Sequence, residues 1–217
     1  MTASLERERN PVRTRQTILD AGERLFAEKG YEATSLNDVG GLAGVSRGTP
    51  GYFFGSKAEL YRAVLERCLE RVRTAVRSGR DRALASREAP EVVLAGAVAE
   101  YFDFIHSNPN FVRLMEWEAL SGGQQLQKGS PHFETAQEAL AAISVELGFE
   151  PSQRAEAAQL LLSIIGLCWF PLVHATTILP ALGLDPVNPD FLQERRRHVV
   201  ALVLQGIRGR FAVPERP

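Results

Sequence analysis

Apolar residues recur along this chain at the spacing of an α-helix. Ile18, Gly22, Leu25 and Phe26 share one predicted helix face, and similar runs follow through most of the sequence. These runs cover residues 36–42, 60–76, 92–105, 133–147, 153–174 and 191–207. The strict alternation typical of β-strands is not sustained anywhere. The pattern therefore predicts an all-α protein of about nine helices.

Several sequence pairs mark where these helices begin. Asparagine or serine can cap free backbone N–H groups, and proline at the first helical position has no N–H to lose. Such pairs are Asn10-Pro11, Asn108-Pro109, Ser130-Pro131 and Asn188-Pro189. Reciprocal capping boxes predict two more starts, at Ser35 with Asp38 and at Ser56 with Glu59. Loops are expected at Gly79–Ala89, Ser121–Ser130 and Leu179–Asn188.

The segment 34–57, which reads TSLNDVGGLAGVSRGTPGYFFGSK, predicts a helix-turn-helix. A short helix capped by Ser35 leads into a turn in which Gly44 is free to adopt a positive φ. Ser46 is the predicted cap of the second short helix. Gly48, Pro50 and Gly51 lower the intrinsic stability of that helix, so packing or DNA must hold it.

The side chains on this second helix suit nucleic acid. Arg47 can donate two hydrogen bonds to guanine in a major groove, and Thr49 and Tyr52 carry hydroxyls that can reach phosphate. Lys57 lies in the first turn of the next helix, where free backbone N–H groups favour an anion. Each residue has a structural alternative: Arg47 and Lys57 as surface charges, and Tyr52 as a core residue.

A dense set of motif residues extends from Arg13 to Tyr61. It comprises Ile18-Leu19, Leu25-Phe26, Glu28-Lys29-Gly30-Tyr31, Thr34-Ser35-Leu36, Asp38-Val39, Ala43-Gly44-Val45-Ser46, Gly48-Thr49, Phe54, Ser56-Lys57 and Glu59-Leu60-Tyr61. With this set, the region resembles the DNA-binding part of TetR/AcrR-type transcriptional repressors. The chain departs from the family pattern at Pro50-Gly51, where many members have Leu-Tyr, and at Gly40, where alanine is usual.

The resemblance implies an architecture and a mechanism. Residues 1–57 would form a three-helix DNA-binding domain, and residues 58–217 a larger helical domain for ligand binding and dimerisation. The partners it implies are double-stranded operator DNA, a small-molecule effector and a second copy of the chain. By position, Arg47 would read bases, while Thr34, Thr49, Tyr52 and Lys57 would contact phosphate. The predicted DNA-binding set is Thr34, Ser35, Ser46, Arg47, Gly48, Thr49, Tyr52 and Lys57.

The charge distribution agrees with an anionic partner for the first part of the chain. The net charge is only −1, but residues 1–87 carry 16 Lys/Arg against 11 Asp/Glu, and residues 88–217 carry 9 against 15. A solvated charge imbalance is the alternative explanation. The acidic second part slightly favours a neutral or cationic effector.

Aromatic and polar side chains mix in the second part of the sequence, as they do in small-molecule sites. The predicted ligand-binding residues are Tyr101, Phe104, His106, Phe111, Met115, Trp117, Trp169 and His174. Ordinary core packing is the alternative for each of them.

Residues 157–184 contain no charged side chain. Pro171 and Pro180 interrupt this stretch, which favours a helix buried on two sides over a membrane span. We expect its own core on one side and a second subunit on the other, in a four-helix bundle on a two-fold axis. The predicted dimer-interface residues are Leu161, Phe170, Phe191, Arg195, Val199, Leu202 and Val203.

Other classes of protein find little support. Cys68 and Cys168 are too far apart in sequence for a zinc-type pair, and the four histidines lack ligand spacing. No catalytic motif is present, and no secretory signal is visible at the start. We therefore expect a cytoplasmic protein with no cofactor, no metal and no enzymatic activity. Two alternatives stay open: a helical small-molecule-binding protein that does not read DNA, and, less favoured, a helical enzyme using Asp103 and His106.

Overall fold

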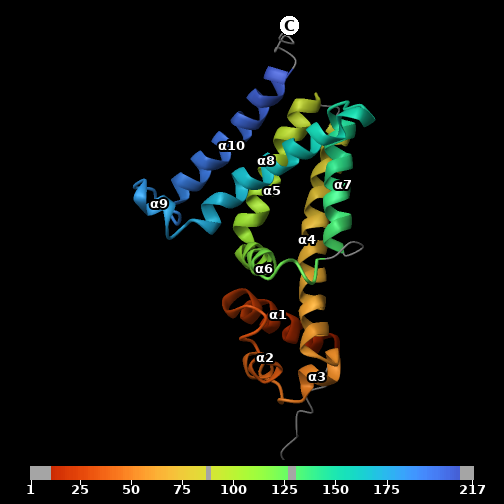
Figure 1. Ribbon diagram of the computed structural model, residues 1–217, viewed down its shortest axis with the longest axis vertical. Helices are drawn as coiled ribbons and strands as arrows, with labels where there is room; N and C mark the ends of the chain where they lie inside the picture. Colours follow the sequence, from red (N-terminus) through yellow and green to blue (C-terminus); the bar gives the residue numbers. More distant parts are fainter. Residues whose placement is uncertain (1–10, 87–88, 127–130, 211–217) are drawn as a thin grey trace, which may run out of the picture. The chain divides into compact units, whose positions relative to one another are not determined.

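The computed structural model describes residues 11–86, 89–126 and 131–210, and within these ranges the chain is helical with no strand (Figure 1). The elements are α1 (Pro11–Lys29), α2 (Leu36–Leu42), α3 (Thr49–Phe54), α4 (Lys57–Ser86), α5 (Pro90–Ser107), α6 (Pro109–Leu120), α7 (Pro131–Glu146), a 3₁₀ turn η1 (Pro151–Gln153), α8 (Arg154–Val173), α9 (Ile178–Ala181) and α10 (Pro189–Arg210). The all-α prediction is confirmed. The described ranges hold ten α-helices where about nine were expected, and α9 is a single turn.

The helix starts predicted from proline pairs and capping boxes are where the sequence placed them. Helices α1, α6, α7 and α10 each begin at the proline of an Asn-Pro or Ser-Pro pair. At the start of α10, the side-chain oxygen of Asn188 accepts a hydrogen bond from the Asp190 N–H at 2.9 Å. Both capping boxes form. The Ser35 hydroxyl accepts from the backbone N–H of Asp38 while the Asp38 carboxylate accepts from that of Ser35, and Ser56 and Glu59 pair in the same way.

The loop expected at Gly79–Ala89 is wrong, because α4 continues through Ser86. Arginine and alanine dominate this stretch and favour helix, and a lone glycine costs only about 1 kcal/mol. The first strong stop is Pro90, where α5 begins. Ion pairs to α7 also support the second half of α4, where Arg73 donates to Glu138 at 3.1 Å and to Glu134 at 3.0 Å.

The chain forms two compact units. One comprises the residues up to Cys68 together with Arg113–Gln125, and the other comprises Leu69–Val112 and the residues from Leu126 onward. Helices α4 and α6 each contribute residues to both units. Each unit therefore combines two separate stretches of the chain, whereas the expected boundary after residue 57 would divide the chain into two consecutive domains.

In the first unit, α1 packs against the first turns of α4. Gly22 of α1 lies against Leu60 and Val64, where an added Cβ would already be 3.4 Å from the Val64 side chain. Next to them, the rings of Phe26 and Tyr61 meet edge to face with centroids 4.8 Å apart. This contact of a small residue with branched side chains, flanked by aromatic rings, is the core that supports the helix-turn-helix.

The last turns of α6 belong to the same unit through a buried polar contact. Glu118 is only 3 % exposed, and its carboxylate accepts from the Tyr61 hydroxyl at 2.8 Å and from the Gln125 backbone N–H at 3.1 Å. Burial raises the pKa of Tyr61, so its hydroxyl keeps the proton it donates. Trp117 packs over Gly30 and donates to the Ala27 carbonyl at 3.3 Å.

We expect Tyr61→Phe to lower the free energy of unfolding by about 1.5–3 kcal/mol, because a buried carboxylate loses a hydrogen-bond donor. Urea denaturation followed by circular dichroism measures the change. The matched control is Tyr52→Phe, which also removes one hydroxyl, but from a side chain that is 85 % exposed. It should change stability by less than about 0.5 kcal/mol. Equal effects of the two variants would contradict the role given to the Tyr61–Glu118 contact.

In the second unit, α5, α8 and α10 pack against one another in all three pairs, and α7 packs on α5 and α8. The core side chains between them are apolar and come from every one of these helices. They include Val98, Phe102, Ile105, Leu140, Ile143, Ile164, Cys168, Val199, Val203 and Ile207.

Candidate nucleic-acid interface

Helices α2 and α3 form a helix-turn-helix of the predicted kind. Gly44 adopts a positive φ of 66°, as expected for the turn, and the next N–H, that of Val45, donates to the Gly40 carbonyl at 3.0 Å. An added Cβ at Gly40 would lie 3.3 Å from the carbonyl oxygen of Ser46, so the glycine permits a close approach of the turn to α2. Gly41, in contrast, has open space around it.

The start of α3 differs from the prediction. Ser46 does not cap the helix: α3 begins at Thr49 with Gly48 in the capping position, and the Ser46 hydroxyl pairs with the Thr49 hydroxyl at 2.6 Å. Pro50 thus falls within the first turn, where its missing N–H costs no helical bond. Pro50 and Phe54 are buried, so packing holds this short helix despite its poor intrinsic propensity.

Some of the residues predicted to contact bases and phosphates are exposed, and others make hydrogen bonds within the protein. Arg47 is exposed in the turn just before α3, and Tyr52 on α3 is 85 % exposed. The alternative of Tyr52 as a core residue is therefore wrong. Thr49 is half-buried. This surface presents a guanidinium and a phenol to solvent.

Thr34 and Ser35 have structural partners. Thr34 is 2 % exposed, and its hydroxyl donates to the Gly30 carbonyl at 2.9 Å, with the Leu25 carbonyl at 3.3 Å. Ser35 caps α2, and its hydrogen bonds to Asp38 lower the pKa of that carboxyl. A phosphate contact by the Thr34 hydroxyl would require it to leave both carbonyls.

Lys57 ties the first turn of α4 to the loop between α1 and α2. Its ammonium donates to the carbonyls of Tyr31 at 3.0 Å and Glu32 at 3.3 Å, and lies 4.2 Å from the centroid of the Tyr31 ring. An ammonium has three donors, so one N–H remains for an anion such as phosphate.

One basic residue beside α3 was not predicted from the sequence. The Arg15 guanidinium lies 4.9 Å from the ring centroid of Phe54, which places a further positive charge beside the end of α3. The signal available in the sequence was the cluster of basic residues at the start of α1.

The predicted ligand residues divide between the two units. Tyr101, Phe104, His106, Phe111 and Trp169 lie together in the second unit, where the Trp169 N–H donates to the Tyr101 oxygen at 2.6 Å and the rings of Phe111 and Trp169 meet edge to face. Met115 and Trp117 belong to the first unit. His174 ends α8, where its ring contacts Phe170 and Thr177.

The predicted dimer residues are also split, here by burial. Phe170 is 45 % exposed and Leu202 is 42 % exposed, whereas Val199 and Val203 are buried within their own chain. Leu161, Phe191 and Arg195 are half-buried. Leu162 was not among the predicted interface residues, yet it is 60 % exposed. Its helical spacing places it on the same face of α8 as Ser163, Gly166 and Phe170, which are also exposed.

The geometry of α1 to α3 defines a helix-turn-helix unit of the kind that binds DNA. Residues 18–64 match the model of the bacterial regulatory proteins of the tetR family. Residues 90–203 match a tetracyclin repressor-like C-terminal domain, which spans more than half of the chain. This protein belongs to the TetR family of transcriptional regulators.

Individual relatives support this placement. The transcriptional repressor NicS of Pseudomonas putida is 24 % identical over 201 residues, covering 90 % of this chain and 93 % of its own. The transcriptional activator FasR of Mycolicibacterium smegmatis is 33 % identical over 101 residues, 46 % of this chain, and this chain covers only 44 % of FasR. A putative TetR-family regulator from Mesorhizobium loti has the same fold, with a TM-score of 0.67 at 18 % identity over 92 % of this chain and 97 % of its own.

Proposed function

We propose that this protein is a transcriptional repressor that binds a near-palindromic operator as a homodimer and leaves it when a small-molecule effector binds. The observation that carries the proposal is the exposed pair of Arg47 and Tyr52 on the helix-turn-helix. Arg47 would read guanine in the major groove, and Tyr52 would contact phosphate with Thr49 beside it. The departure at Pro50-Gly51 leaves this surface intact, because Pro50 packs inward.

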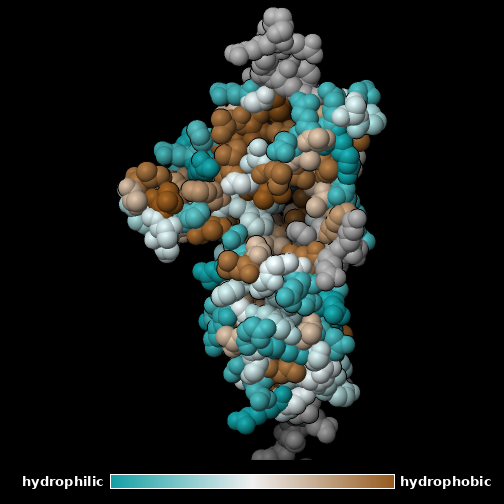
Figure 2. Space-filling view, in the orientation of Figure 1, coloured by the Kyte–Doolittle hydropathy of each residue, from teal (hydrophilic) through white to brown (hydrophobic). Residues whose placement is uncertain are grey.

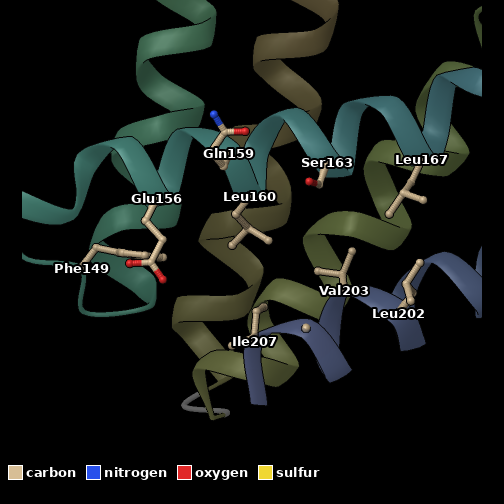
Figure 3. A pocket seen from close by; sticks show the side chains of 10 residues that line it. Phe149, Glu156, Gln159, Leu160, Ser163, Leu167, Leu202, Val203 and Ile207 are labelled. Atoms are coloured by element: carbon tan, nitrogen blue, oxygen red, sulfur yellow. The ribbon is translucent and has the colours of Figure 1, made fainter. Parts of the chain in front are cut away.

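Homodimerisation would use the outer face of α8 and α10. Figure 2 shows hydrophobic surface over these helices and at α9. A groove of about 690 Å³ runs between α8 and α10, lined by Leu160, Leu167, Leu202, Val203 and Ile207 with a few polar residues (Figure 3).

Small residues on both helices favour close approach of a second copy to this face. Gly166 on α8 and Gly206 on α10 have open space where a Cβ would lie. The exposed Leu162 and Phe170 add large apolar side chains to α8. Two copies related by a two-fold axis would pack α8 and α10 into the four-helix bundle expected from the sequence.

The segment Pro151–Val173 is, among the described residues, the one helix long and apolar enough to cross a membrane, and 22 % of its most apolar window is buried. In a DNA-binding regulator, a dimer interface on this helix explains its exposed apolar surface without a membrane. We therefore propose a cytoplasmic location, no membrane partner and no enzymatic activity. Asp103, considered above as a catalytic partner of His106, pairs with Arg196 at 2.8 Å.

The effector would bind in the second unit, where aromatic and polar side chains meet. An effector can shift the protein away from DNA only if it binds the conformation that does not bind DNA more tightly than the one that does. Helices α4 and α6 contribute residues to both units, so they are the segments through which we expect the change to pass.

Lys57→Ala should weaken binding to every DNA sequence alike, because a phosphate contact carries no base preference. The homodimer loses two such contacts, one in each half-site, so the slope of log K against log salt should become shallower by about two. The variant should also unfold at a lower temperature, since the Tyr31 and Glu32 carbonyls lose their donor. Fluorescence anisotropy at several salt concentrations and a thermal melt measure the two effects. A lower melting temperature with an unchanged salt slope would assign Lys57 to the fold alone.

The function itself is tested by selection of genomic fragments on the purified protein at moderate salt, followed by sequencing. The proposal expects one near-palindromic motif with half-sites about one helical turn apart. Recovery of salt-labile background without a motif would contradict it.

A further inference from the structure

The connection between α8 and α10 carries an apolar projection at α9. Its exposed large side chains are Ile178, Leu182, Leu184 and Val187, and we call these four side chains the α9 knob. Leu182 is 67 % exposed and Val187 is 80 % exposed, so water covers most of both side chains. Apolar side chains gathered on the surface of a soluble protein mark a contact with another molecule.

Backbone hydrogen bonds fix the turn that carries the α9 knob. Gly183 adopts a positive φ of 70°, and its N–H donates to the Pro180 carbonyl at 3.0 Å. The next N–H, that of Leu184, donates to the Leu179 carbonyl at 2.9 Å. These two bonds form the Schellman motif that commonly ends a helix, and the Leu179 side chain is buried beneath it. A preformed projection loses little conformational entropy when it docks, which favours a stable contact.

The matching surface is the groove between α8 and α10. Its volume is about 690 Å³, and its apolar lining includes Leu160 and Leu167 on α8 and Ile207 on α10 (Figure 3). The groove and the α9 knob lie toward opposite ends of α10. From Pro189, where α10 begins, to Gly206 in the groove, the helix rises about 26 Å. The knob of one chain therefore cannot fill the groove of the same chain.

A two-fold axis can bring each knob onto the groove of the other copy. In a face-to-face pair the axis lies in the interface, so a surface on one side of the axis meets the surface on the opposite side in the partner. Gly166 of α8 lies between the two surfaces. Leu160 in the groove is about 9 Å before it along the helix, and Val173, which leads toward the knob, is about 10 Å after it. Gly166 has open space where a Cβ would lie, so two copies of α8 can cross closely at this point.

The area of the interface also requires more than the two helices. Helices α8 and α10 have 20 and 22 residues, so side by side they present a footprint of about 600 Å². Stable interfaces bury about 800 Å² from each partner, and permanent ones bury more. The apolar surface at α9 is visible in Figure 2 from the same side as that over α8 and α10, so it can extend the same interface.

We infer that the α9 knob of one subunit occupies the groove between α8 and α10 of its partner, at two symmetry-related places in the dimer. The occupant of the groove is thus a second copy of this chain. This inference rests on the proposed function, because it names the contact that holds the proposed homodimer together. It also removes the groove as an effector site, since the partner fills it.

The first test is cross-linking of the full-length protein with Leu182→Cys and Gly206→Cys combined, one cysteine in the knob and one in the groove. Because Cys68 and Cys168 are buried, a short bismaleimide reacts mainly with the two new thiols. The double variant should give a covalent dimer on a denaturing gel, and neither single variant should. The control combines Leu182→Cys with Gly96→Cys, an exposed glycine of α5 outside the groove, and should give no covalent dimer.

The second test fills the groove from within its own chain. Gly206→Phe adds a ring to the groove without removing a contact, because no atom lies within 4 Å of the place of its Cβ. The dissociation constant of the dimer, measured by sedimentation, should rise by about a hundredfold or more, because the contact is lost at both places. Gly96→Phe makes the same change at a glycine with equally open surroundings and should leave the constant unaffected.

Three results would each overturn the inference while leaving the homodimer in place. The double cysteine variant gives no covalent dimer, or Leu182→Cys alone gives one, which means that the two knobs meet each other. In the third, Gly206→Phe dimerises as tightly as the unaltered protein, which leaves the groove to another occupant such as the effector. A monomeric unaltered protein at micromolar concentration has a different meaning, since it rejects the proposed homodimer itself.

Discussion

Replacing Arg47 with alanine is expected to abolish most of the sequence preference of this protein while leaving its fold intact. A bidentate contact between arginine and guanine contributes about 1–3 kcal/mol of discrimination, and a homodimer carries one such contact in each half-site. Arg47 is exposed in the turn before α3, so its removal should not disturb the core. The measurement is competition between the selected operator and a scrambled duplex of equal length, at fixed salt.

The matched control is Arg24→Ala. Arg24 is an exposed arginine of the same unit, paired with Glu28 four residues along α1, and surface pairs of this kind contribute little. This variant should keep the full ratio of operator to scrambled affinity. If Arg47→Ala also kept that ratio, the assignment of Arg47 as the base-reading residue would be wrong.

Leu162→Glu is expected to separate the dimer and, with it, to remove high-affinity operator binding. Leu162 is 60 % exposed in the apolar face of α8, and its partner in a two-fold bundle would be the same face of a second copy. Truncations at the centre of an interface cost about 2–4 kcal/mol, and an unpaired buried charge adds to this. The dissociation constant of the dimer should therefore rise by at least about a hundredfold. Sedimentation at micromolar concentration measures it.

Leu120→Glu is the corresponding control, because Leu120 is 80 % exposed at the end of α6, away from α8 and α10 in the sequence. It makes the same chemical change and should leave the dimer unaffected. A dimer of undiminished strength in Leu162→Glu would move the interface elsewhere. Loss of the dimer in both variants would indicate a general loss of folding, which the helical circular dichroism signal distinguishes.

Most of the helix-turn-helix could be predicted from sequence because its determinants are local. The capping box at Ser35, the positive φ at Gly44 and the inward position of Phe54 each depend on residues a few positions apart. The start of α3 could not be placed in this way. Ser46 and Gly48 are both acceptable caps, and the choice between them follows from how Pro50 packs, which is a tertiary contact.

The roles of polar side chains were harder to predict for the same reason. Thr34 and Lys57 matched the family pattern by position, yet their donors bond to carbonyls of the loop between α1 and α2 and the end of α1. Periodicity indicates which face of a helix a residue occupies. It does not indicate which carbonyl that residue meets.

The sequence by itself determined the helices, the helix-turn-helix and the family, because caps, apolar spacing and motif residues act over short stretches of chain. Only the tertiary structure decided which side chains of the second part remain exposed on α8 and α10, and where a groove opens between these helices. Those outcomes depend on three helices, α5, α8 and α10, that are far apart in sequence and pack together. Burial and the pairing of charges are properties of that packing, so no single helix encodes them.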